Sequence, residues 1–342
     1  MPKAIVLMTA LVPTIGHAAL IRFAETVSGG NPRVIVSARS FEPVTIQDRV
    51  GAIQKAFPQA KVFAHLDDNA PQNPDPSLEW DTAFWDYWKN IVNSFFTVEE
   101  DDIVVASEPY CIPLAKALNC QFMPFDLNRT LVPVKGTEVR KDMTSNWEAI
   151  LPEFRAKIKK TVTIFGAESC GKTTMTKYLS NYYGASYIEE WARPYLELVG
   201  PEITMDKMKE ISKGQFALQV TAKQDVSSIV TFQDTDLFST VGYYRILNKQ
   251  SPRIVEQMAS MMKSDLYIVM NDLIPFEPDI LRYGDNKRES ETQFWIDILN
   301  EFGCDYYVIK QTDLACQTAE ARSVIDDLVD KTIGPIEEFI RD

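Results

Sequence analysis

The chain has 342 residues, of which 45% are hydrophobic and 24% are charged. This composition is typical of a soluble globular protein, and the length suits two domains that each have a core of their own. The formal net charge of −13 at pH 7 argues against a nucleic-acid-binding surface, because such a surface needs a basic face that displaces counterions from the phosphates.

The first half of the chain alternates apolar strands with amphipathic helices. Residues 3–9, KAIVLMT, form a continuous apolar run that is typical of a buried strand. Further strands are expected at 33–36, 62–66, 103–106 and 122–125, and helices at 18–27, 46–57 and 81–96. This alternation predicts a doubly wound, mostly parallel sheet with helices on both faces.

A first candidate anion-binding turn follows the first strand at residues 14–17, TIGH. Gly16 would let the backbone approach an anion at a helix start, where the helix dipole also favours negative charge. His17, as a cationic or hydrogen-bonding imidazole, would steady a phosphate that becomes a leaving group. The alternative is that Thr14 only caps the helix and that His17 is incidental. The spacing alone favours neither interpretation.

A second turn of the same kind occurs at residues 134–140, VKGTEVR. Gly136 would form the turn, Thr137 would cap the next helix, and Arg140 would bring a guanidinium to the same helix start. Alone this pattern is weak, but two phosphate-binding turns in one small α/β domain favour a nucleotide site. The segment 146–160 closes this domain and leads into a linker. We therefore expect domains at 1–155 and 156–342.

The most specific motif opens the second half. Residues 166–173, GAESCGKT, fit G-x-x-x-x-G-K-[ST], and they stand between a β-branched strand and a helical run that ends at Gly184. Backbone N–H groups of such a loop converge on phosphate oxygens, Lys172 reaches the outer phosphates, and Thr173 holds Mg²⁺. The sequence therefore predicts a site for ATP, with Mg²⁺ as its cofactor.

Carboxylates follow two of the strands beside this loop. One strand precedes the loop, and four more are expected at 185–188, 228–233, 266–270 and 306–309, which gives a set of five. Glu190 follows the first of these, where a nucleoside kinase has its general base. Asp234 and Asp236 follow the second, where an acidic partner for Mg²⁺ is expected, and either residue suits that role. The basic loop 275–288 is suited to close over phosphates as a lid, and an ordinary surface loop is the alternative.

Cysteine usage and apolar runs indicate the compartment. The five cysteines are odd in number and form no C-x-x-C pair, so we expect reduced thiols in a cytoplasmic protein and neither a disulfide framework nor a zinc site. No apolar run approaches the roughly 18 residues of a membrane span. The N-terminus lacks the basic and apolar regions of a signal peptide and starts directly as a strand.

The first half also resembles the adenylyltransferase domain of the bifunctional nicotinamide-mononucleotide adenylyltransferase/ribosylnicotinamide kinase family. Residues 14–17 correspond to its (H/T)-x-G-H motif. The stretch 125–140, FDLNRTLVPVKGTEVR, and the segment 147–155 correspond to its second motif and the residues around it. The chain departs from that motif at Lys135, which stands in the place of a Ser.

The second half resembles the ribosylnicotinamide kinase domain of the same family. The segments that correspond are 168–174 (ESCGKTT), 190–195 (EWARPY), 234–236 (DTD) and 279–282 (DILR). Cys170 and Ile280 depart from the usual Ser and Gly. The resemblance spans nearly the whole chain with its motifs in order. It implies an α/β protein with an N-terminal HxGH-type nucleotidyltransferase domain, which is Rossmann-like, and a C-terminal P-loop kinase domain.

The motifs and the resemblance together imply four sets of site residues. Catalytic roles are implied for Thr14, His17, Arg140, Lys172, Glu190 and Asp236. ATP binding is implied for Gly16, His17, Gly136, Thr137, Arg140, Gly166, Glu168, Ser169, Gly171, Lys172, Thr173, Thr174, Arg282 and Arg288. Substrate binding is implied for Arg49, Trp85, Trp88, Asp126, Arg129, Trp191, Arg193, Tyr195 and Asp236. Metal binding is implied for Thr173 and Asp234. For the two tryptophans of residues 81–96, packing in the core is the alternative.

The implied protein is a two-step enzyme of NAD biosynthesis. The second domain would use ATP and Mg²⁺ to phosphorylate nicotinamide riboside, and the first would adenylylate the resulting mononucleotide (NMN) with a second ATP, giving NAD and pyrophosphate. The expected partners are these small molecules, with no nucleic acid and no membrane, and a homo-oligomer is left open. One alternative is a coenzyme A-type adenylyltransferase and kinase pair. Another is a nucleotide-sensing regulator, which would need a helix-turn-helix segment that we do not expect here, because the chain starts with the adenylyltransferase strand.

Overall fold

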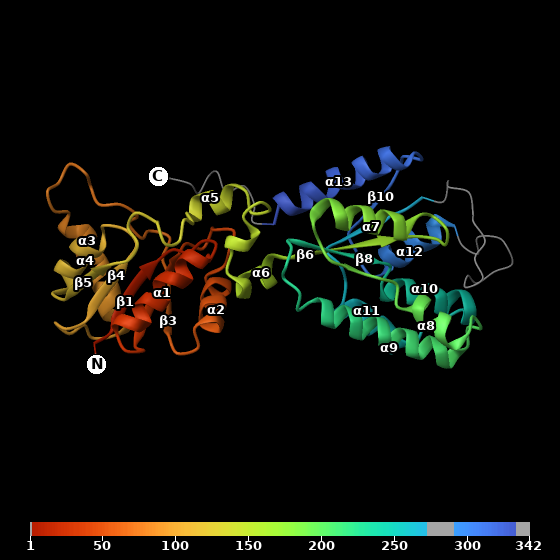
Figure 1. Cartoon of the computed structure of the whole chain (residues 1–342), viewed down its shortest axis with the longest axis horizontal. Coiled ribbons are helices and arrows are strands. Elements are labelled where there is room, and N and C mark those ends of the chain that lie inside the picture. The colour runs from red at the N-terminus through yellow and green to blue at the C-terminus, as the bar shows by residue number, and fades with distance from the viewer. Residues whose placement is uncertain (1, 272–290, 333–342) are drawn as a thin grey trace. The chain divides into compact units, whose positions relative to one another are not determined.

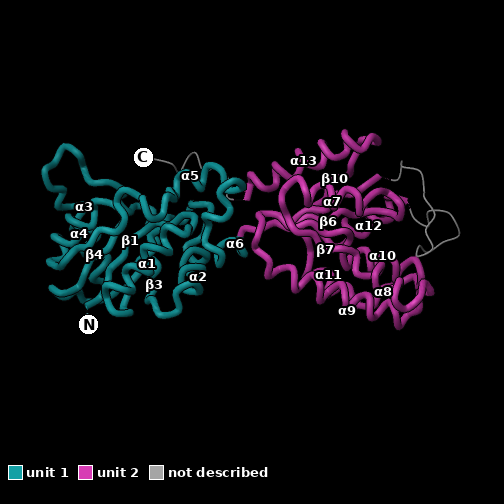
Figure 2. The backbone as a smooth tube through the Cα atoms, in the orientation of Figure 1, with its two compact units in different colours: residues 1–157, 333–342 teal, residues 158–332 magenta. Residues whose placement is uncertain are grey.

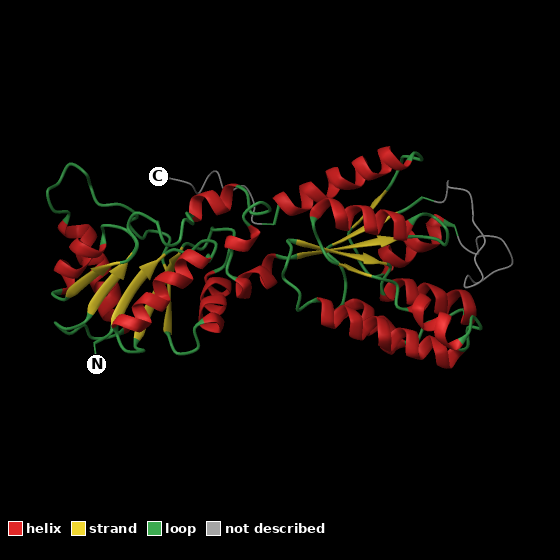
Figure 3. Ribbon diagram, viewed as in Figure 1, coloured by secondary structure: helices red, strands yellow, loops and turns green. Residues whose placement is uncertain are grey.

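The computed structural model describes residues 2–271 and 291–332. These residues form two compact units, unit 1 with residues 2–157 and unit 2 with Ile158–Thr332 (Figure 2). Each unit is built around one five-stranded parallel sheet that is covered by helices (Figure 3). The α/β class and the doubly wound parallel sheets are thus confirmed. Within the described ranges, none of the helices has the length and apolar character needed to cross a membrane.

Unit 1 contains five strands and the helices that connect them (Figure 1). In chain order the elements are β1 (Ala4–Met8), α1 (Ile15–Val27), β2 (Pro32–Ala38), α2 (Ile46–Ala56), β3 (Lys61–Leu66), α3 (Thr82–Phe95), β4 (Ile103–Ala106), α4 (Cys111–Leu118), β5 (Gln121–Pro124), α5 (Gly136–Lys141), a 3₁₀ turn (Trp147–Ala149) and α6 (Pro152–Ile158). The strand order is β3-β2-β1-β4-β5. The chain reverses direction across the sheet between β1 and β4, and ligands of such sheets bind beyond the carboxyl ends of the strands at this point.

The central strand of unit 1 explains the apolar run at the start of the chain. Ala4, Ile5 and Val6 are fully buried, because right-handed crossovers put α1 and α2 on one face of the sheet and α3 and α4 on the other. In the parallel register, Ile5 lies opposite both Arg33 and Val104. A strand that is covered on both faces has no solvent side, so it shows no alternation of polar and apolar residues.

Unit 2 has the same type of architecture. Its elements are β6 (Lys160–Phe165), α7 (Lys172–Tyr183), β7 (Tyr187–Ile188), α8 (Ala192–Val199), α9 (Met205–Ala222), β8 (Val230–Asp234), α10 (Leu237–Asn248), α11 (Arg253–Met261), β9 (Leu266–Val269), α12 (Thr292–Glu301), β10 (Tyr306–Val308) and α13 (Leu314–Asp330). The strand order is β10-β9-β6-β8-β7. In Figure 1, α7 and α13 lie on one face of this sheet, and α9, α10 and α11 lie on the other. The strand expected at 185–188 is shorter than predicted, since only Tyr187 and Ile188 pair with β8.

Candidate functional site

The phosphate-binding loop of unit 2 connects central strand β6 to helix α7. The backbone has positive φ at Gly166 (129°), Ser169 (56°) and Gly171 (86°), and the helix begins directly after Gly171. A Cβ atom on Gly166 would lie 2.9 Å from the carbonyl oxygen of Met270, so glycine is required there. Side chains cannot replace these glycines without distorting the loop, which explains their spacing in the sequence.

Two side chains of the loop are held by nearby oxygen atoms. Lys172 Nζ donates to the backbone oxygen of Ala167 over 2.6 Å. Thr173 Oγ1 donates to Asp234 Oδ2 over 2.5 Å, which brings the end of β8 to the start of α7. Burial raises the pKa of Asp234, while the Thr173 hydroxyl and the positive charge of Lys172 oppose this rise. The two residues predicted to hold a metal therefore lie in direct contact.

The donor set at Asp234 fits Mg²⁺. Asp234 Oδ1 is buried and has no hydrogen-bond partner, and a buried carboxylate oxygen of this kind requires a cation or a donor. No cluster of three or more His, Cys, Asp and Glu side chains that could hold a metal occurs in the described ranges. Mg²⁺ needs no such cluster beside a nucleotide, because phosphate oxygens and waters supply most of its ligands.

A cavity of about 610 Å³ lies in front of this loop. Its lining brings together residues 168–174 of the loop with Glu190, Arg193 and Asp236. Burial raises the pKa of the half-buried Glu190, Lys172 lowers it, and Asp234 raises it further. A carboxylate whose pKa is raised is a stronger base than an ordinary glutamate, which suits it to act as a general base.

Asp236 is held more tightly than Glu190. It is the N-cap of α10, and its Oδ1 accepts from the backbone N–H of Phe238 over 2.9 Å. Its Oδ2 accepts from the hydroxyl of Tyr267 over 2.7 Å. Burial raises the pKa of Asp236 to about 6 in spite of these hydrogen bonds. Asp236 lines the cavity, but each of its oxygens already has a donor.

The aromatic pair of the 190–195 segment lies outside this lining. Trp191 and Tyr195 stack on each other, with ring centroids 4.7 Å apart and planes inclined by 23°. Neither residue lines the 610 Å³ cavity, whereas Glu190 and Arg193 of the same segment do. Arg282, Arg288 and the whole predicted lid at 275–288 lie outside the described residues.

Several cavity residues had no role in the sequence-based prediction. Gln215 of α9 and Tyr243 of α10 line the cavity beside Glu190, and Thr312 and Gln317 line it on the side of β10. The polar Gln215 inside a long helix is a weak signal by itself. The other three carry no sequence signal, because only the fold brings them to the loop.

The TIGH turn of unit 1 fixes the protonation of its histidine. Thr14 is the N-cap of α1, and its backbone N–H donates to His17 Nδ1 over 3.0 Å. Nδ1 is therefore an acceptor, and the ring proton is on Nε2. Burial, followed by the charges of Arg140 and Arg129, lowers the pKa of His17 to about 4. Of the two forms considered from the sequence, the neutral hydrogen-bonding imidazole is the one that this environment favours.

The second turn of unit 1 lies against the first. A Cβ atom on Gly136 would be 3.4 Å from the Arg140 guanidinium and 3.9 Å from the His17 ring. Thr137 Oγ1 and Arg140 Nε are buried without a hydrogen-bond partner. These groups line a cavity of about 240 Å³ together with Thr14 and Gly16. Unpaired donors around a small cavity that is bordered by a helix start are suited to an anion such as a phosphate.

Asp126 and Arg129 line the same cavity but are bound by their own loop. The Asp126 carboxylate accepts from the backbone N–H groups of Thr130, Leu131 and Val132 at 2.9–3.1 Å. Arg129 donates to the backbone oxygen of Val134 over 3.1 Å and pairs with Glu108 over 3.2 Å. Their present contacts shape the cavity wall.

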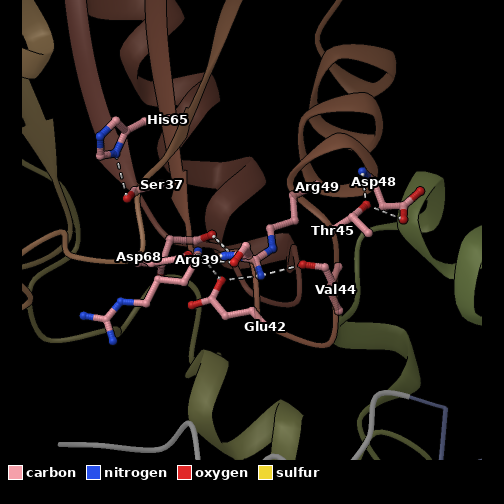
Figure 4. A network of polar contacts seen from close by, with 11 residues as sticks. Ser37, Arg39, Glu42, Val44, Thr45, Asp48, Arg49, His65 and Asp68 are labelled. Atoms are coloured by element: carbon pink, nitrogen blue, oxygen red, sulfur yellow. Dashed lines mark hydrogen bonds and ion pairs between the residues drawn. The ribbon is translucent and has the colours of Figure 1, made fainter.

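Arg49 is completely buried, and Figure 4 shows its guanidinium directed toward Glu42 and Val44. It donates to Glu42 over 2.6 Å and to the backbone oxygens of Val44 and Thr9 over 2.7 and 3.2 Å. Arg49 does not line the 240 Å³ cavity. Its charge acts on the cavity through Arg140, whose pKa is lowered by burial first and by Arg49 second.

The two tryptophans of α3 are in the hydrophobic core of unit 1. Trp85 and Trp88 are each only 7% exposed. Phe84 packs edge-on against Trp85 with a centroid distance of 4.7 Å, and Trp88 packs against His65 at 5.6 Å. Neither indole lines the 240 Å³ cavity. Both tryptophans therefore pack in the core, which is the alternative that the sequence left open.

Comparison with known proteins adds to this geometry. The profile of the family described as "AAA domain" matches residues 161–316. The "Trifunctional NAD biosynthesis/regulator protein NadR" of Escherichia coli (strain K12) is 25% identical over 287 residues, which cover 81% of this chain and 68% of that protein. Its counterpart from Salmonella typhimurium is 24% identical over the same shares.

Solved structures of NadR share the fold. A crystal structure of NadR in complex with NAD and AMP-PNP superimposes with a TM-score of 0.64 at 20% identity and covers 96% of each chain. A structure of NadR in complex with NR gives a TM-score of 0.63 at 19% identity over 98% of each chain. The chain carries a P-loop α/β unit and is homologous to NadR.

Proposed function

We propose that the protein is a bifunctional enzyme of NAD biosynthesis, with a ribosylnicotinamide kinase in unit 2 and an NMN adenylyltransferase in unit 1. The homology to NadR supports a role in NAD biosynthesis. The observation that carries the finer proposal is the presence of two separate cavities. Each lies at a helix start and is lined by basic or hydrogen-bonding residues suited to phosphate groups. Two consecutive ATP-dependent steps require two such sites.

In the kinase step, the 5′-hydroxyl oxygen of nicotinamide riboside attacks the γ-phosphorus of ATP, and ADP leaves. Lys172 and the backbone of residues 166–171 bind the phosphates and neutralise the charge that develops on them. Glu190 accepts the proton of the hydroxyl, because it lines this cavity and has a raised pKa, and because it does not cap a helix as Asp236 does. Asp236 and Arg193 orient the ribose from the same wall.

Thr173 and Asp234 would hold Mg²⁺. Asp234 Oδ1 has no hydrogen-bond partner, and the Thr173 hydroxyl donates to Asp234 Oδ2. These are hard oxygen atoms of the kind that this ion prefers. When bound, the ion neutralises phosphate charge. The chain's own contribution is to bring the end of β8 to the P-loop, where the Thr173 hydroxyl contacts Asp234.

In the transferase step, a phosphate oxygen of NMN attacks the α-phosphorus of a second ATP, and pyrophosphate leaves. His17 donates from Nε2, since Nδ1 is occupied by the Thr14 N–H. Thr137 at the start of α5 and Arg140, whose guanidinium lies beside Gly136, supply further donors. No covalent intermediate is needed, so catalysis consists of orienting the two nucleotides and stabilising the charge of the transition state.

Substrate choice separates this proposal from the coenzyme A-type alternative. The purified protein is incubated with ATP and Mg²⁺ and with either nicotinamide riboside or phosphopantetheine, and the nucleotide products are separated by chromatography. We expect NMN, NAD, ADP and pyrophosphate from the riboside, and no new product from phosphopantetheine. Turnover of phosphopantetheine with none of the riboside would overturn the proposal.

A further inference from the structure

One side chain of the unit 2 cavity has a fixed orientation and an unused donor. Gln215 lies in the middle of α9, lines the 610 Å³ cavity and is only 3% exposed. Its Oε1 accepts from the backbone N–H of Trp191 over 2.9 Å, so the opposite amide orientation would set two donors against each other. Its Nε2 is buried and has no hydrogen-bond partner. Gln215 Nε2 can therefore donate a hydrogen bond to a ligand in the cavity.

The Trp191 indole can pack closely on α9 because Gly214 of that helix has no side chain. A Cβ atom on Gly214 would lie 2.2 Å from the Trp191 indole, so the ring packs directly on the helix backbone. Tyr195 stacks on the same ring. This packing fixes the Trp191 backbone, and the Trp191 N–H in turn fixes the amide of Gln215. The aromatic pair thus acts on the cavity through Gln215, which lines it.

The surroundings of Gln215 indicate what binds there. Met208 and Ile211 precede it on the same buried face of α9, and both line the cavity with Leu196 of α8. Glu190 lines the same cavity from the loop before α8. A flat ring would be covered by these apolar side chains, and one polar donor among them would recognise one acceptor on the ring. An unpaired donor in such a place costs free energy until a ligand accepts from it.

We propose that Gln215 Nε2 donates to the exocyclic carbonyl oxygen on the base of the nucleoside that unit 2 phosphorylates, and that Trp191 is the positioning residue for this contact. The inference rests on the proposed kinase function and adds the residue that selects the base. The ligand class is a pyridine nucleoside with a carboxamide. A base that lacks the carbonyl would leave the donor unpaired and would bind more weakly.

The test compares two ligands and two proteins. Nicotinamide riboside and the unsubstituted pyridinium riboside differ only in the carboxamide, and their Kd values are measured by calorimetry in the presence of AMP-PNP and Mg²⁺. For the wild type we expect the carboxamide to improve Kd by about tenfold. In Gln215→Glu the Trp191 N–H keeps an acceptor but the donor is lost, so the ratio should fall to about one. Both ligands carry the same ring charge, so attraction to the new carboxylate cancels in the ratio.

A matched control lies one turn further along the helix. Gln219 is also buried on α9, but it donates to Gln233 Oε1 over 2.7 Å and does not line the cavity. Gln219→Glu should keep the tenfold ratio, even if its thermal stability falls. Gln215→Met provides a neutral second variant in which the ratio should also be lost.

The outcomes separate this inference from the proposed function. A carboxamide preference that persists in Gln215→Glu and Gln215→Met, or that is absent from a wild type that phosphorylates the riboside, would overturn the role of Gln215 alone. The preference could instead depend on Gln215 in a protein that never phosphorylates the riboside. That result would support the contact with the carboxamide and overturn the proposed kinase activity. A wild type that binds neither riboside would overturn both.

Discussion

The backbone N–H of Thr14 donates to His17 Nδ1 over 3.0 Å, and this single contact sets the role of the histidine. With Nδ1 accepting and the pKa lowered to about 4 by burial and two arginines, the ring at neutral pH is an uncharged donor through Nε2. It can stabilise a growing negative charge by donating a hydrogen bond from Nε2.

This relationship predicts the titration of His17. The chain has only two histidines, so His17→Asn assigns its signal in an NMR titration. We expect the ring to stay neutral down to about pH 4. The folded pKa lies below the unfolded value of 6.5, so protons bind preferentially to the unfolded chain, and this contribution to stability is lost as pH falls from 6.5 towards 4. His17→Asn should therefore lose less stability over that window. A folded His17 that titrates near 6.5 would contradict this account.

Asp234→Asn should impair the kinase through its metal site. The amide oxygen can still accept from the Thr173 hydroxyl, but the negative charge that attracts Mg²⁺ is lost. We expect phosphoryl transfer to fall by roughly 10²- to 10³-fold, with a higher Mg²⁺ concentration for half-maximal rate. Asp265→Asn, at an exposed carboxylate that accepts from the Thr161 N–H, is the control and should leave both quantities unchanged. An unaltered Mg²⁺ dependence in Asp234→Asn would exclude it as a metal ligand.

Glu190 should set the acid limb of the kinase pH profile. Its pKa is raised mainly by burial, so the base becomes protonated, and kcat/KM falls, at a higher pH than for an ordinary glutamate. Glu190→Gln should lower kcat by about 10²-fold or more and remove this limb. Glu189→Gln, at the exposed neighbouring position, should retain it. If Glu190→Gln kept the limb and Asp236→Asn removed it, the base would be Asp236.

Two glycines of unit 2 should respond differently to alanine. Gly184 has φ of 57° and nothing within 4 Å of its Cβ position, so Gly184→Ala should cost about 1 kcal/mol in the free energy of unfolding. Gly166 has φ of 129° and the Met270 carbonyl 2.9 Å away. Gly166→Ala should cost at least about 3 kcal/mol, because backbone strain and overlap add. Urea unfolding measures both, and equal costs would contradict the loop geometry.

The sequence was most informative where chemistry and chain order coincide. The P-loop could be predicted because its glycines, Lys172 and Thr173 are contiguous, and because a strand precedes and a helix follows them. The two parallel sheets could be predicted because strands that are covered on both faces are continuously apolar. These features depend on local sequence, which a motif or a period detects.

The contacts between distant segments could not be predicted in this way. Trp191 was expected to bind substrate, yet it does not line the cavity. Its indole packs on Gly214, and its backbone N–H donates to the cavity residue Gln215. Trp85 and Trp88 have the same helical spacing in a core as in a binding site, so only their neighbours distinguish the two. Gln215 stands out only when its amide is seen to be fixed on one side and unpaired on the other.

The central claim is that each unit carries one of two consecutive reactions, and reciprocal variants test it in a single product analysis. Lys172→Ala and Arg140→Ala are each incubated with ATP, Mg²⁺ and either nicotinamide riboside or NMN. We predict that Lys172→Ala forms no NMN from the riboside but still converts NMN to NAD. Arg140→Ala should accumulate NMN from the riboside and form little NAD from either substrate. If both activities disappeared together in either folded variant, or if neither variant changed the products, the assignment of one reaction to each unit would be contradicted.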